Sequence, residues 1–101
     1  MYIFAVVESA SGAIKACYEA LTLPDGSSNP LAGNVMPEGH EVVRVNIDIL
    51  TADYIRLQAA AAGMAPSQFI CQNYNADMQA TVAVPQGLTV PVPVKPLAPK
   101  A

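Results

Sequence analysis

The sequence has few charged and few aromatic side chains. Of its 101 residues, 13% are charged and 6% are aromatic, and there is no Trp. This charged fraction is about half the roughly 25% of a typical domain, which argues against a chain that is disordered throughout. The hydrophobic fraction of 52% consists mostly of Ala and Val. Because a core of such small residues buries little area per residue, we expect a partner or a second copy to complete it.

The sequence also lacks the short motifs of common catalytic sites. There is no Walker A loop, no Gly-x-Gly-x-x-Gly and no Gly-x-Ser-x-Gly. Neither Cys17 nor Cys71 belongs to a Cys-x-x-Cys pair, so we expect no disulfide scaffold and no metal site. The single histidine, His40, lies among Gly and Pro residues, where a surface or capping role is expected. We predict that the protein is not an enzyme and uses no cofactor, although a triad assembled in space stays open at this point.

No apolar run approaches the ~18 residues that cross a membrane, and the first residues lack the basic region of a signal peptide. We therefore expect a soluble protein that is made in a cytoplasm and has no membrane partner. The net charge of −3 is unevenly spread, because residues 1–80 hold eight acids and three bases and residues 81–101 hold two lysines. An acidic body is a poor match for nucleic-acid phosphates, but a basic tail could bind the body of another copy.

Three strands are predicted in the first half of the chain. Residues 2–8 and 13–21 flank a Ser-Gly turn and predict a β-hairpin, with Ile14, Ala16 and Tyr18 on one face of its second strand. A loop rich in Pro, Gly and Asn follows over residues 24–40 and is expected to cover a surface or touch a partner. Residues 41–50 alternate as a strand with one buried face, made of Val43, Val45, Ile47 and Ile49.

Two short helices are predicted after this strand. Thr51 is the expected N-cap of the first, and Gly63 is expected to end it. Pro66 and Ser67 open the second helix. A run of four alanines in the first helix suits close packing against another helix. The apolar stripes at spacings of three and four are Tyr54, Leu57, Ala61 and Met64 in the first helix and Ile70, Tyr74 and Met78 in the second.

The last segment, residues 81–101, is rich in Pro and Val and is predicted to be an extended arm outside the body formed by residues 1–80. Its valines have even numbers, whereas Pro85, Pro91 and Pro93 have odd numbers. An extended chain of this pattern has one apolar face and one lateral edge that keeps its N–H donors, so it could add to the edge of a neighbouring sheet. A loose polyproline-like tail is the alternative. The residues predicted to bind a partner are Val82, Val84, Leu88, Val90, Val92, Val94 and Lys95.

Residues 43–79 resemble the ribbon-helix-helix family of dimeric regulators. The resemblance lies in the strand Arg44-Val45-Asn46-Ile47-Asp48-Ile49, in Thr51 and Leu57, and in the run from Gly63 to Ile70. It implies that the strand pairs with the same strand of a second copy. The alternative is that the strand pairs within its own chain. In the family, the outward strand residues read the major groove and the start of the second helix holds a phosphate. The residues at those positions here are Arg44, Asn46, Asp48 and Ser67.

The N-terminal half looks like small phage proteins encoded among structural genes. Together these features predict an α+β fold with an N-terminal hairpin, a third strand in a small antiparallel sheet, two short helices and an extended arm. The predicted function is that of a structural or assembly protein, a multi-copy bacteriophage virion component whose arm clamps a neighbour. Its expected partners are its own copies, other virion proteins, or both. The alternative is a dimeric, cytoplasmic DNA-binding regulator.

Overall fold

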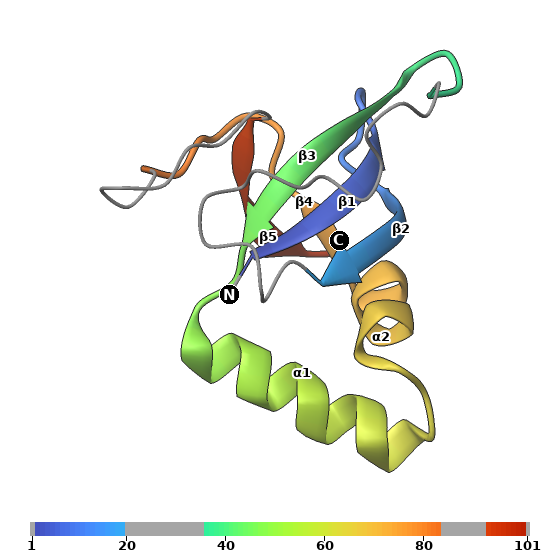
Figure 1. Ribbon diagram of the computed structural model, residues 1–101, viewed down its shortest axis with the longest axis vertical. Coiled ribbons are helices and arrows are strands. Elements are labelled where there is room, and N and C mark those ends of the chain that lie inside the picture. The colour runs from blue at the N-terminus through green and yellow to red at the C-terminus, as the bar shows by residue number, and fades with distance from the viewer. Residues whose placement is uncertain (1, 20–35, 84–92, 101) are drawn as a thin grey trace.

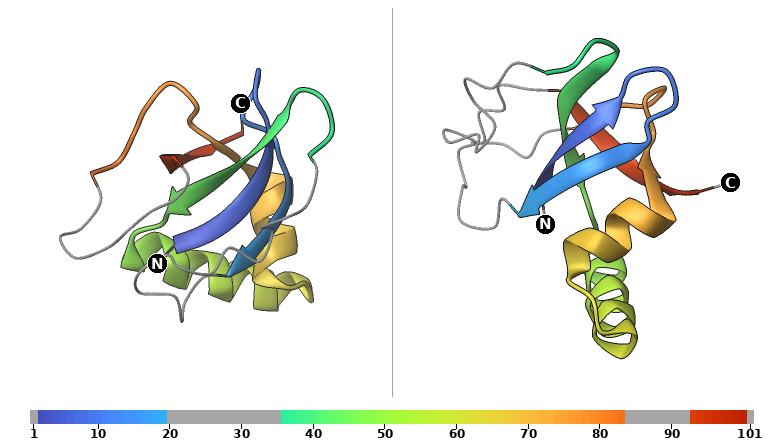
Figure 2. Two further views of the ribbon diagram at one scale, coloured as in Figure 1. Left: turned by 45° about the horizontal axis from the view of Figure 1, so that its top comes forward. Right: turned by 90° about the vertical axis from the view of Figure 1, so that its right-hand side faces the viewer.

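A computed structural model describes residues 2–19, 36–83 and 93–100 of the chain. Five strands form one mixed sheet in the order β2-β1-β3-β5-β4, and two helices lie together beside it (Figures 1 and 2). This arrangement confirms the predicted α+β class. The elements are β1 (Tyr2–Glu8), β2 (Ile14–Glu19), β3 (His40–Asn46), α1 (Ile49–Ala62), α2 (Pro66–Asn73), β4 (Tyr74–Ala76) and β5 (Val94–Pro99).

The first three strands form the predicted antiparallel part of the sheet. β1 is its centre and pairs antiparallel with β2 on one side and with β3 on the other. The hairpin prediction is therefore confirmed, and β3 pairs within its own chain. The remaining edge of β3 is also occupied, because it pairs in parallel with β5.

β5 is the main difference from the expected organisation. It lies inside the sheet, between β3 and β4, and its Val94 is buried. Residues 94–99 are therefore part of the sheet, which differs from the arm predicted over residues 81–101. A parallel pair needs a long crossover connection, and the chain between β3 and β5, which includes both helices, provides it.

The sheet curls until its two outer strands approach each other. Ala13, just before β2, forms a bridge with Asn75 of β4, and the Ala76 N–H donates to the Gly12 carbonyl at 2.8 Å. Gly12 has a φ of 77°, and a Cβ at this position would overlap the carbonyl oxygen of Ala76. Only glycine permits this turn and this close approach together.

The core lies between the sheet and the helices. Val43, Val45 and Ile47 are buried as predicted, beside Ile3, Ala5 and Val7 of β1. The helices contribute Ala52, Ile55 and Ile70 to the same cluster.

The face predicted for β2 is wrong because of an irregularity in its pairing. Val6 pairs with Ala16 but Val7 pairs with Ile14, so the register shifts between them and Lys15 is an additional residue, as in a β-bulge. The shift puts Ile14 and Cys17 in the core and leaves Tyr18 exposed.

The limits of α1 agree with the prediction at one end only. α1 begins at Ile49 with Asp48 as its N-cap, not with Thr51, because the Asp48 carboxylate accepts hydrogen bonds from the Thr51 N–H at 3.1 Å and its hydroxyl at 2.6 Å. Consequently Ile49 is an exposed helix residue and not a buried strand residue. The end of α1 at Gly63 is confirmed by a φ of 68°, which is the left-handed conformation of a helix terminus.

α2 begins at Pro66 as predicted but ends at Asn73. Tyr74 already has extended backbone and starts β4, which pairs with β5. The predicted stripe of Ile70, Tyr74 and Met78 is therefore not one helix face. At Tyr74, pairing with β5, a strand far away in the sequence, replaces the helical conformation.

Candidate interaction surfaces

Within the described ranges, the structure brings no three His, Cys, Asp or Glu side chains together in a way that could hold a metal ion. His40 stands at the start of β3, with its Nδ1 3.0 Å from the carbonyl oxygen of Glu38 in the preceding turn. No helix among these residues is long and apolar enough to cross a bilayer.

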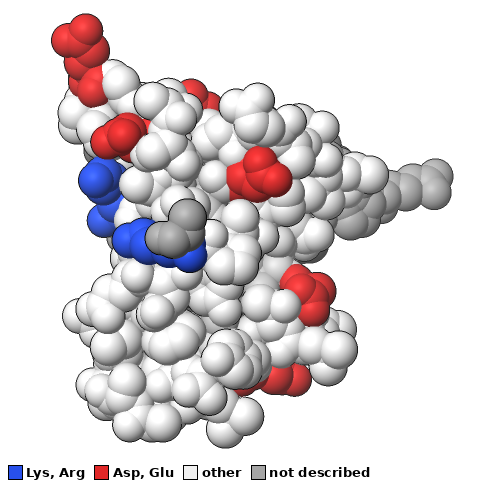
Figure 3. Space-filling model, turned by 180° about the vertical axis from the view of Figure 1, so that it is seen from behind, with Lys and Arg blue, Asp and Glu red and all other residues white. Residues whose placement is uncertain are grey.

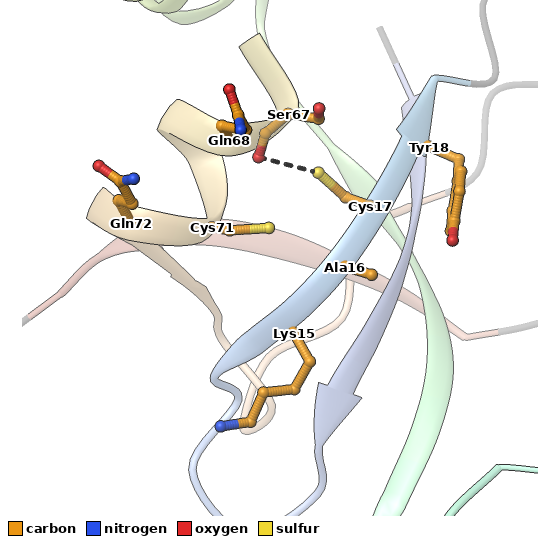
Figure 4. A pocket seen from close by; sticks show the side chains of 8 residues that line it. All are labelled: Lys15, Ala16, Cys17, Tyr18, Ser67, Gln68, Cys71 and Gln72. Atoms are coloured by element: carbon orange, nitrogen blue, oxygen red, sulfur yellow. Dashed lines mark hydrogen bonds between the residues drawn. The ribbon is translucent and has the colours of Figure 1, made fainter. Parts of the chain in front are cut away.

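One groove, of about 320 Å³, lies between β2 and α2 (Figure 4). β2 is at the end of the sheet order, and α2 packs against it. Cys17 closes the groove, with its Sγ 3.5 Å from the Ser67 carbonyl oxygen. An outer strand beside a groove is a place where an extended segment can add to a sheet. The lining residues are Lys15, Ala16, Cys17, Tyr18, Ser67, Gln68, Cys71 and Gln72.

A second groove, of about 470 Å³, lies where the end of β3 meets β5. Asn46 and Asp48 line it together with Val82 and Tyr74. Burial, and to a smaller extent the nearby Tyr54, raises the pKa of Tyr74. The hydrogen bonds from Thr51 hold the pKa of the Asp48 carboxyl below its usual range, so this groove has an ionised carboxylate at its rim at neutral pH.

The residues predicted to bind a partner are distributed over several places. Val84, Leu88, Val90 and Val92 lie outside the described residues. Val82 donates its N–H to the carbonyl oxygen of Val94 at 3.2 Å, and Lys95 donates its Nζ to the Met78 carbonyl at 3.3 Å. The two ends of the predicted arm are therefore joined to the body and to each other.

The four residues predicted to contact DNA do not share a surface. Arg44 is only 1% exposed and its guanidinium lies 5.1 Å from the centre of the Phe4 ring. Asn46 and Asp48 line the groove at the end of β3, whereas Ser67 lines the groove beside β2.

The most unusual surface belongs to α1. Leu50, Tyr54 and Leu57 are 80%, 53% and 70% exposed, and Ile49 beside them is 75% exposed. The helical part of the molecule, lowest in Figure 3, shows little charge from that side. The spacing of Tyr54 and Leu57 was predicted, but it does not identify them as surface residues, because the same spacing is typical of a buried helix face.

Comparisons with family models, with curated proteins and with solved structures found no match for this chain.

Proposed function

We propose that this protein is a non-enzymatic structural protein that acts by assembling with its own copies or with other proteins. The observation that carries the proposal is the exposed face of α1. Large apolar patches on a soluble surface mark sites of protein contact, and four large apolar side chains within nine residues of one helix are each more than half exposed.

Two further features support assembly. β2 is an outer strand with a groove beside it, which suits the addition of an extended segment. The apolar residues at even positions in 82–92 suit such a segment. We propose that this part of the chain, between two body-bound ends, clamps a neighbour. The likeness of the N-terminal half to phage structural proteins makes a bacteriophage virion the setting that we propose for this assembly.

The clamp can be tested because Val82 and Val94 are hydrogen-bonded to each other. A short Gly-Ser linker can therefore replace residues 84–92 without separating β5 from the sheet. We expect the full chain to form oligomers in sedimentation velocity experiments, and the excised variant to form fewer or smaller ones with an unchanged circular dichroism spectrum. Equal assembly of the two proteins would contradict the proposed clamp.

The wider proposal has its own test, because the partners could be other proteins. The chain is co-expressed with the products of the genes beside its own, and complexes are isolated and sized. A chain that neither self-associates nor enters any such complex is not an assembly protein.

A further inference from the structure

Four of the exposed apolar residues of α1 form one continuous stripe. Leu50, Tyr54, Leu57 and Ala61 follow each other at spacings of four, three and four residues. This is the spacing with which the side chains of one helix pack into the spaces of another. We call these four residues the outer stripe. Its geometry fits a helix better than it fits a strand or a flat surface.

The outer stripe is not the face by which α1 joins its own core. That face consists of Ala52, Ile55 and Ala59, all buried. With about 100° between successive residues of a helix, the two faces point about 160° apart. A helix that is apolar on both sides is normally buried on both sides, so the outer stripe needs a second element to cover it.

The order of residues in the outer stripe identifies that element. α1 runs from 49 to 62, so its midpoint lies between residues 55 and 56. Leu50 and Ala61 are equally far from this midpoint, and so are Tyr54 and Leu57. A two-fold axis through the midpoint would place Leu50 against Ala61 of the partner subunit, a large residue against a small one. It would also place Tyr54 against Leu57 of the partner subunit. Such self-complementarity is what a two-fold interface requires.

The charges of α1 are compatible with this arrangement. Its only two charged residues, Asp53 and Arg56, form an ion pair with each other at 3.4 Å. Two copies therefore approach through a neutral surface, although the whole chain carries −3. An antiparallel pair also puts the positive end of one helix dipole beside the negative end of the other.

We propose that α1 pairs antiparallel with α1 of a second copy, around a two-fold axis at the helix midpoint. This inference rests on the proposed assembly function and names the partner of one surface. A helix of 14 residues is only ~21 Å long. Such a pair buries less than the ~800 Å² per partner of a standard interface, so we expect a dimer that dissociates on dilution.

Sedimentation equilibrium of the full chain tests the pairing. We expect Leu57→Glu to shift the protein to monomer at concentrations where the unchanged chain is dimeric, with the same circular dichroism spectrum because Leu57 is exposed. Arg56→Gln is the matched control, since it changes the net charge by the same amount on a side of α1 away from the outer stripe. It should leave the dimer intact. A Leu57→Glu protein as dimeric as the unchanged chain would overturn the proposal.

A complementary pair tests the antiparallel arrangement. Tyr54→Lys alone should also be monomeric. An equimolar mixture of Tyr54→Lys and Leu57→Glu should recover the dimer, because the proposed axis places the new Lys against the new Glu. Failure of the mixture to associate would overturn this register. If the unchanged chain is monomeric at all concentrations, the outer stripe has another occupant and the self-pairing is wrong, whereas entry of the chain into other complexes would still support the proposed function.

Discussion

Gly12 and Gly39 share one backbone conformation, with φ of 77° at each, but they differ in their surroundings. A methyl group at Gly39 would meet no atom within 4 Å, whereas one at Gly12 would overlap the Ala76 carbonyl. We expect Gly39→Ala to lower the free energy of unfolding by about 1 to 2 kcal/mol, the cost of the left-handed conformation. Gly12→Ala should cost at least about twice as much, since the junction of β2 with β4 must move as well. Urea titrations of the two variants compare them, and equal losses would show that the contact at Gly12 is not tight.

Asp48 provides a prediction about pH. Its carboxylate caps α1, and the hydrogen bonds from Thr51 lower its pKa in the folded state. A lowered pKa contributes stability that is present above the pKa of the unfolded chain, about 3.9. That contribution is lost as the pH falls through the lower value of the folded state. We expect the midpoint of unfolding to fall less steeply with pH in Asp48→Asn, because Asn can still cap the helix but does not titrate. Identical slopes between pH 5 and pH 3 would contradict this role.

Helix α1 has two apolar faces with different roles. Ile55 is 1% exposed and belongs to the core, whereas Leu57 is 70% exposed. We expect Ile55→Ala to cost about 2 to 5 kcal/mol, as a buried large-to-small change does. Leu57→Ala should change the stability by less than about 0.5 kcal/mol when the protein is dilute enough to be monomeric. Chemical unfolding at low concentration compares the variants, and a large loss for Leu57→Ala would mean that another part of the same chain covers it.

Elements that depend on nearby residues were predictable from the sequence. The hairpin follows from β-branched residues around a Ser-Gly turn, the end of α1 follows from Gly63, and the start of α2 follows from Pro66. The alternation of Val43, Val45 and Ile47 correctly predicted the buried face of β3.

Features that depend on distant partners were not predictable in this way. The additional residue at Lys15 shows only in the pairing of β2 with β1, and β4 exists because β5 lies beside it. The exposed face of α1 was missed for a related reason. The exposed stripe that contains Leu57 and the buried stripe that contains Ala59 both have helical periodicity. Because the exposed stripe has the larger residues, the sequence alone indicates that it is the core face. The tertiary structure instead buries the small alanines.

In the whole molecule, β5 connects the antiparallel strands β1, β2 and β3 to β4. It pairs with β3 on one side and is the pairing partner of β4 on the other. We expect a chain lacking residues 93–101 to lose cooperative unfolding, because β3 would gain a free edge and β4 would lose its strand partner. Replacement of residues 84–92 by a short linker should preserve a single transition. Thermal unfolding followed by circular dichroism distinguishes the two changes, and a cooperative transition in the truncated chain would mean that β5 is dispensable.

The position of β5 also has a consequence for how the protein is made. Translation delivers the chain from its N-terminus at about 5 to 20 residues per second, so β5 is the last of the described strands to leave the ribosome. The hairpin, β3 and both helices are exposed before it, with the edge of β3 still unpaired. For that interval the nascent chain carries both an open strand edge and the apolar face of α1. In a protein that many ribosomes make at once, neighbouring chains could meet through these surfaces, so the speed at which β5 is synthesised should influence how much of the product folds alone before it assembles.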